Sequence, residues 1–135
     1  MKVLIDTHIA VWFLWAPERL SDKVRRLLSE ETDAGRKLGL AAISVFELVY
    51  LVEKRRLESV VLECVLDAIG QPDGPFEQVP LIAAMAVSLQ DISAVTVPDM
   101  PDRIFAAAAR YQGVPLVSKD ARIRRLDPSV LQVIW

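Results

Sequence analysis

Short apolar segments alternate along the chain with longer segments in which apolar residues recur at helical spacing. Short apolar runs bounded by turn residues are typical of strands buried on both faces of a parallel sheet. Strands are predicted over residues 3–5, 38–43, 76–79, 115–117 and 130–134. Helices are predicted over residues 7–14, 21–29, 44–54, 59–69, 81–89, 101–111 and 120–125. Strands and helices therefore alternate along most of the chain.

This alternation predicts an α/β fold. Parallel strands are joined by right-handed crossovers through helices, which then cover both faces of the sheet. We therefore expect three layers, with a mainly parallel sheet of about five strands in the middle. The 135 residues contain no repeat, linker or low-complexity segment, and their number is usual for one domain. A single domain over residues 1–135 is predicted.

Composition narrows the possible classes of protein. Hydrophobic residues make up 53% of the chain and the net charge is −2, so the protein is not a polycation that binds nucleic acid through net charge alone. A single cysteine and a single histidine exclude an internal disulfide and His-pair or Cys-rich zinc motifs. The N-terminal apolar run is too short for a signal peptide and no apolar run is long enough to span a membrane. We expect a cytoplasmic protein.

Acidic residues follow several of the predicted strands. Asp6 follows the first strand, Asp120 follows the fourth, and Glu47 lies in the helix after the second. Asp102 opens the helix over residues 101–111, with Asp99 just before it. Because ligands bind at the carboxyl ends of parallel strands, we expect these side chains to converge. Converging carboxylates repel one another, and a hard divalent cation such as Mg²⁺ or Mn²⁺ relieves that repulsion.

Helix capping is the alternative explanation for these acids. Carboxylates cap the free N–H groups at helix N-termini, and residues 44–47 (SVFE) match a capping box. A non-catalytic binding module, whose acids are all caps, would need nothing more. Two features favour a site instead. Glu47 shares its helix face with mostly apolar residues, and the alanines that follow Asp102 allow close packing against the sheet.

Four segments together resemble a known family. Residues 5–8 (IDTH), 43–47 (ISVFE), 99–103 (DMPDR) and 116–120 (LVSKD) occur in the order and spacing of the PIN-domain ribonucleases, and more narrowly of the VapC-type toxins of toxin–antitoxin pairs. The resemblance implies a PIN-like fold and an Mg²⁺- or Mn²⁺-dependent endoribonuclease. Its acidic quartet, which is both catalytic and metal-binding, carries over here as Asp6, Glu47, Asp102 and Asp120. Asp99 matches an accessory acid, Ser118 replaces a frequent Thr, and Phe46 replaces a frequent Trp.

The resemblance also implies partners. The substrate would be RNA, cut to leave a 5′-phosphate and a 3′-hydroxyl; transfer, ribosomal and messenger RNA are all compatible targets. The C-terminal segment of an antitoxin would lie in a hydrophobic groove, and toxin subunits would pair as homodimers. The crowded residues Trp12, Phe13 and Trp15 and the apolar helix over residues 45–52 are candidate walls of that groove.

Basic residues gather near the C-terminus. Residues 102–125 contain six basic and two acidic side chains. Arg103 and Arg110 share a helix face and are candidates for contacts with RNA phosphates, with Ser118 as a further polar contact. The alternative is a solvated basic surface. His8 is expected to pack or to form a hydrogen bond rather than to act as a base.

Overall fold

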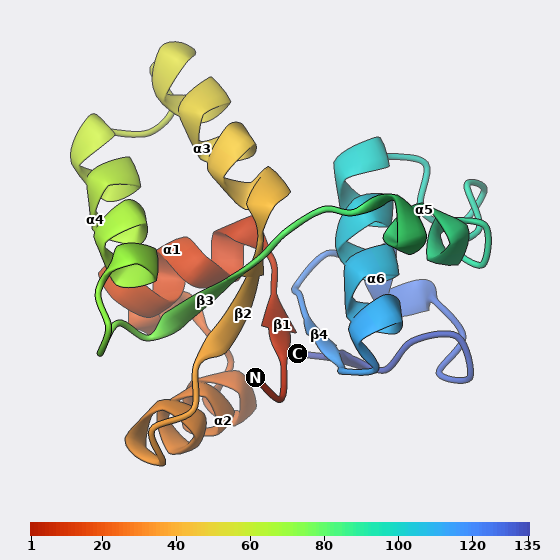
Figure 1. Ribbon diagram of the computed structural model, residues 1–135, viewed down its shortest axis with the longest axis horizontal. Coiled ribbons are helices and arrows are strands. Elements are labelled where there is room, and N and C mark those ends of the chain that lie inside the picture. Colours follow the sequence, from red (N-terminus) through yellow and green to blue (C-terminus); the bar gives the residue numbers. More distant parts are fainter.

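The computed structural model describes all 135 residues and contains one five-stranded sheet (Figure 1). The strand order is β3-β2-β1-β4-β5. Every neighbouring pair is parallel, with Leu4 of β1 opposite Gly39 of β2 and Leu116 of β4. The strands are β1 (Leu4–Ile5), β2 (Leu38–Ala41), β3 (Phe76–Val79), β4 (Leu116–Val117) and β5 (Val133–Ile134). The predicted five-stranded parallel sheet is confirmed.

Helices cover both faces of this sheet, as predicted. They are α1 (Thr7–Trp15), α2 (Asp22–Asp33), α3 (Ala42–Glu53), α4 (Ser59–Gly70), α5 (Ala83–Leu89) and α6 (Met100–Gln112), with short 3₁₀ turns at Pro17–Arg19 and Ile123–Arg125. Figure 1 shows α1, α2 and α4 on one side of the strands and α5 and α6 on the other. None of the helices has the length and apolar character that crossing a membrane requires.

Each face of the sheet has its own apolar core because side chains alternate along a strand. Leu4 packs with α5 and α6, whereas its neighbour Ile5 packs with α1, α2 and α4. On the first side α6 contributes an almost continuous buried run, Phe105 and the four alanines after it. These small side chains let the start of α6, which carries Asp102, lie close to the carboxyl ends of the strands. Gly113 ends α6 in the left-handed conformation (φ 67°), as predicted.

Several predicted boundaries are wrong. The strand predicted over residues 38–43 ends at Ala41, and α3 begins at once at Ala42 without any side-chain cap. Ser44 is therefore a buried residue inside α3, and the capping box predicted at residues 44–47 does not exist. An apolar run suits a buried strand and a buried helix equally, so it cannot mark the junction between them. Residues 81–82 and 130–132 lie outside α5 and β5, and residues 120–125 form a turn followed by the 3₁₀ turn rather than an α-helix.

The two arginines predicted to meet RNA phosphates form contacts within the protein instead. Arg103 donates to the carbonyl oxygen of Ile92 from Nε (3.1 Å) and Nη2 (3.0 Å), and to that of Leu89 (3.1 Å). Arg110 pairs with Asp91 (2.9 Å) and donates to the carbonyl oxygen of Val130. Both tie loop segments to α6. We therefore assign them a role in the fold, and their contact with RNA phosphates stays a prediction.

Replacing Arg103 tests this assignment. We expect Arg103→Ala to lower the free energy of unfolding by about 2 kcal/mol, because it removes charged hydrogen bonds and leaves carbonyl groups without partners. Arg122→Ala is the matched control: this exposed side chain has no partner in the structure, and its loss changes stability by less than about 0.5 kcal/mol. Urea denaturation measures both. Equal stability of the two variants would contradict the assignment.

Candidate metal and active site

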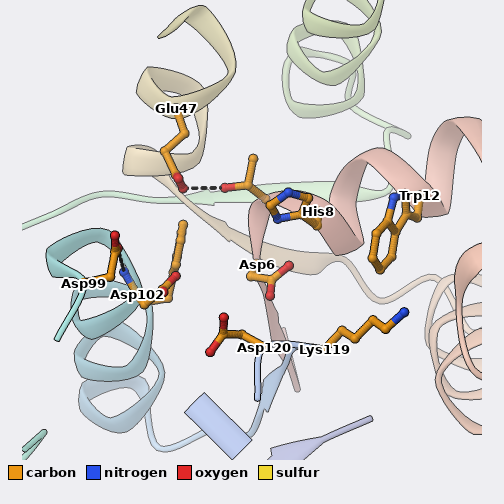
Figure 2. Close-up of a pocket in the computed structure, with 10 residues that line it drawn as sticks. Asp6, His8, Trp12, Glu47, Asp99, Asp102, Lys119 and Asp120 are labelled. Atoms are coloured by element: carbon orange, nitrogen blue, oxygen red, sulfur yellow. Dashed lines mark hydrogen bonds between the residues drawn. The ribbon is translucent and has the colours of Figure 1, made fainter. Parts of the chain in front are cut away.

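A cavity of about 580 Å³ opens at the carboxyl edge of the sheet, where β1, β2 and β4 end (Figure 2). Its walls come from the strand ends and from α1, α3 and α6. It brings together all five acids that the sequence predicted to converge. The residues that line it are Asp6, Thr7, His8, Trp12, Glu47, Asp99, Asp102, Phe105, Lys119 and Asp120.

Asp6 lies at the centre of this arrangement, directly after β1. It is 7% exposed, and its Oδ1 accepts a hydrogen bond from the N–H of Ile9 (2.9 Å), which caps α1. Burial raises the pKa of Asp6, while the Ser118 hydroxyl and the Ile9 N–H partly lower it. Asp6 therefore caps a helix and lines the cavity at the same time, so capping does not exclude a role in a site. The cap holds one carboxylate oxygen and so fixes the side chain at the cavity.

Asp120 is held by the turn that follows β4. Its Oδ1 accepts hydrogen bonds from the N–H groups of Arg122 (2.8 Å) and Ile123 (2.9 Å). The Asp120 N–H in turn donates to the Ser118 hydroxyl (3.1 Å). Ser118 is completely buried and does not line the cavity. Its place orders the loop around Asp120 and leaves it no access to a substrate, contrary to the predicted contact.

The start of α6 supplies two acids with different surroundings. Asp99 caps the helix, because its Oδ1 accepts from the N–H of Asp102 (3.1 Å). The carboxylate of Asp102 accepts no hydrogen bond from the protein and is half-buried. Burial, as the largest cause, and then the charges of Asp99, Asp120, Glu47 and Asp6 together raise the pKa of Asp102 to about 7. Asp102 caps no helix, and its ionisation is opposed by burial and by the other acids of the cluster.

Glu47 reaches the cavity from α3 and is held by a residue that the sequence did not single out. The Thr7 hydroxyl donates to Glu47 Oε1 (2.8 Å) and lies 3.0 Å from the buried Ser44 hydroxyl. Burial raises the pKa of Glu47, and the hydrogen bond from Thr7 partly lowers it. The only sequence feature of Thr7 was its place between Asp6 and His8. A contact across 40 residues has no local pattern from which to predict it.

The donor set fits a hard divalent cation. All five acids offer oxygen atoms, and none takes part in any of the four ion pairs of the structure. No three of the side chains stand close enough to ligate one ion directly. Mg²⁺ commonly keeps several waters and uses one or two carboxylates, so this spacing suits a hydrated ion. No protein cation forms an ion pair with these acids.

The opposite wall of the cavity is aromatic and basic. His8 is exposed, forms no hydrogen bond, and has its ring centroid 5.8 Å from that of Trp12. Lys119 lies against the rings of both Trp12 and Trp135, with its Nζ 5.7 Å and 5.5 Å from their centroids. In the sequence Lys119 stands out only as part of a basic segment, and no local pattern connects it with either tryptophan because the three residues lie far apart in the chain.

Comparisons with known proteins agree with this geometry. The family model described as "PIN domain" matches residues 3–128. The chain is 34% identical over 124 residues to Ribonuclease VapC22 of Mycobacterium tuberculosis, covering 90% of this chain and 89% of that protein.

Solved structures share the fold. A chain in the crystal structure of VapBC2 from Rickettsia felis bound to a promoter DNA fragment superimposes with a TM-score of 0.72 at 16% identity, covering 99% of this chain and 98% of that one. A chain in DNA-bound VapBC from Salmonella typhimurium gives 0.67 at 18% identity, covering 99% and 97%. The sequence match and the common fold together show that the chain belongs to the PIN-domain family and, within it, to the VapC proteins.

Proposed function

We propose that this protein is an Mg²⁺- or Mn²⁺-dependent endoribonuclease of the cytoplasm and the toxin of a VapBC-type toxin–antitoxin pair. One observation carries the proposal: five carboxylates converge in one cavity and form no ion pair, and one of them has a pKa of about 7. Kinship with Ribonuclease VapC22 supports RNA as the substrate. A module whose acids serve only as caps accounts poorly for Asp102, which caps nothing and is costly to ionise.

The four acids Asp6, Glu47, Asp102 and Asp120 would hold the cation, one or two of them directly and the others through its bound waters, with Asp99 as an accessory. When bound, the cation supplies positive charge at the scissile phosphate and makes water a stronger nucleophile. The chain's own part is positional. The Ile9 N–H fixes Asp6, the Thr7 hydroxyl fixes Glu47, and the turn after β4 fixes Asp120. Because water rather than the RNA 2′-hydroxyl would be the nucleophile, no cyclic phosphate forms; with the 3′-oxygen as leaving group, the products carry a 5′-phosphate and a 3′-hydroxyl.

Asp102 contributes a proton exchange. Its pKa of about 7 leaves it half protonated at neutral pH, and a cation that binds to the carboxylate displaces the proton. Cation binding and proton release are therefore coupled at this residue. The coupling separates Asp102 from Asp99, whose carboxylate is already engaged with the N-terminus of α6.

RNA cleavage tests the proposed activity. Antitoxin-free protein is incubated with total cellular RNA in Mg²⁺, Mn²⁺ or EDTA, and cut positions and end groups are mapped by sequencing. We expect discrete cuts with 5′-phosphate ends that require a divalent cation. Asp6→Asn and Asp102→Asn should lower the rate by about 100-fold or more, the scale for loss of one group that stabilises charge in the reaction.

Asp127→Asn is the matched control for the cleavage experiment. Asp127 is also an acid that accepts backbone hydrogen bonds, here from Ser129 (2.8 Å), but it does not line the cavity. It should cleave like the wild type. A cyclic phosphate at the cut ends would overturn the proposed hydrolysis. Absence of both cleavage and Mn²⁺ binding would favour the binding module.

The pH dependence of cation binding tests the role of Asp102. At about pH 6 a group with a pKa of about 7 is mostly protonated, and at about pH 8 it is mostly ionised. We therefore expect the affinity for Mn²⁺ to rise about tenfold over this range. Calorimetry in two buffers of different ionisation enthalpy measures the proton that is released. Asp102→Asn should bind more weakly and lose most of this pH dependence; a wild-type affinity that does not change with pH would contradict the coupling.

Two separate apolar surfaces fit the two protein partners that we propose. The first lies on α3 and α4, where Phe46 is 74% exposed beside Val49 and Tyr50. The second is a groove of about 200 Å³ between α5 and α6, lined only by apolar residues: Leu81, Ile82, Met85, Ala86, Leu89, Met100, Ile104 and Ala107. We assign the first to the C-terminal segment of the antitoxin, because α3 is apolar on nearly all sides, and the second to a second copy of this chain.

Charged substitutions separate the two surfaces. We expect Ile82→Glu to give a monomer that still co-purifies with a co-expressed VapB-type antitoxin, because Ile82 belongs only to the α5–α6 groove. Phe46→Glu should weaken antitoxin binding and leave the oligomeric state of the free toxin unchanged. Both side chains are exposed, so folding should be unaffected, which thermal unfolding checks. Light scattering after gel filtration gives the oligomeric state. If Ile82→Glu weakens antitoxin binding and Phe46→Glu gives a monomer, the assignment of the two surfaces is wrong.

A further inference from the structure

A lysine ammonium stands at the acidic cavity and forms an ion pair with none of its carboxylates. Lys119 directly precedes Asp120 and lines the cavity, yet it takes part in none of the ion pairs of the structure. Figure 2 shows its side chain leading away from Asp120 and toward Trp12. Five nearby carboxylates attract this cation, so something else must hold it in place.

Two indole rings hold the ammonium. Its Nζ lies 5.7 Å from the centroid of Trp12 and 5.5 Å from that of Trp135, both within the range of a cation–π interaction. The rings contact each other with centroids 6.2 Å apart. Trp12 belongs to α1, and Trp135 follows β5, whose Ile134 carbonyl accepts the Ser118 N–H (3.1 Å). The clamp is therefore built on the sheet and on a packed helix.

This arrangement keeps one positive charge available to an incoming anion. An ion pair with Asp120 would cancel the charge of Lys119, whereas an indole face attracts the ammonium without neutralising it. Lys119 remains exposed to solvent. Lys119 is the only lysine or arginine that lines the cavity. Arg103 and Arg110 form hydrogen bonds within the fold outside it. A polyanion that enters the acidic cavity meets this cation at its wall.

We propose that Lys119 binds a phosphate of the RNA strand next to the scissile phosphate, and that Trp12 and Trp135 position its ammonium away from the carboxylates. The inference rests on the proposed ribonuclease activity and adds a substrate-binding residue to it. Lys119 touches the substrate. The two tryptophans act through Lys119 and are positioning residues.

Lys119→Met tests the phosphate contact. Methionine keeps an unbranched apolar stem against the indoles and removes the charge. With a labelled single-stranded RNA that contains a mapped cut site, we expect KM to rise about tenfold and kcat to change little. The slope of log KM against log salt concentration should also fall by about 0.7, the value for one phosphate contact on a single strand. A purely structural role would not change the salt slope.

Lys54→Met is the matched control. Lys54 also lies over an aromatic ring, with its Nζ 5.6 Å from the centroid of Tyr50, but it does not line the cavity. Its KM and salt slope should equal those of the wild type. Trp135→Leu removes half of the clamp and should raise KM while Lys119 is still present. Thermal unfolding confirms that each variant is folded.

The outcomes separate this inference from the proposed activity. If the wild type cleaves RNA and Lys119→Met keeps the wild-type KM and salt slope, the phosphate contact is disproved and the ribonuclease stands. If the wild type cleaves no RNA, fluorescence anisotropy with the same RNA and the Asp102→Asn protein decides. Binding that weakens when Lys119→Met is added supports the contact without the activity, and binding that is unchanged disproves the contact.

Discussion

Mutual repulsion of five carboxylates at one edge of a sheet is the constraint on which this site depends. The fold meets it with backbone N–H groups. Asp6 and Asp99 cap α1 and α6, and Asp120 accepts from the turn after β4. α1 and the turn after β4 follow strands directly and α6 follows a loop after α5, yet all three place their N–H groups and partial positive charges at the carboxyl edge of the sheet. The segments that collect the acids therefore also supply the hydrogen bonds that hold them, and capping is part of how the site is built.

Backbone hydrogen bonds offset only part of the free-energy cost of placing these carboxylates together, and the remaining cost is seen in the raised pKa of Asp102. Its pKa in the folded chain, about 7, lies above the ordinary value of 3.8. The folded state consequently binds this proton more tightly than the unfolded state does. The stability linked to Asp102 is complete below about pH 4 and is lost as the pH rises through 7. A cation that binds the ionised cluster reverses this loss by binding the folded state alone. The protein thus gives up stability at the place where it needs negative charge.

The sequence alone predicted the sheet and the converging acids because both follow from local features. Short apolar runs indicate strands, and the parallel arrangement brings residues such as Asp6 and Asp120 to one edge. The missing parts depend on packing between distant segments. The residues next to Thr7 in the sequence give no sign of its hydrogen bond to Glu47. Those next to Lys119 give no sign of its contacts with Trp12 and Trp135. Arg103 and Arg110 do lie on α6 as predicted, but carbonyl groups from the Leu89–Ile92 region and from Val130 reach them first. Helical spacing cannot predict such partners.

Charge compensation links the two halves of the cavity. Without a cation the acidic wall would repel the RNA that we propose as substrate, and Lys119 is the only lysine or arginine that lines the cavity. Bound cation changes the sign of the interaction at the acidic wall, so the metal and the RNA should each strengthen the binding of the other, and by the same factor. The indole clamp matters for this coupling. If Lys119 paired with Asp120 instead, it would occupy a carboxylate of the proposed cation site and would lose the charge that the proposed phosphate contact requires. Because the aromatic rings hold the Lys119 ammonium, the carboxylates stay free for the proposed metal ion and the ammonium stays free for the proposed RNA, both at the end of β4.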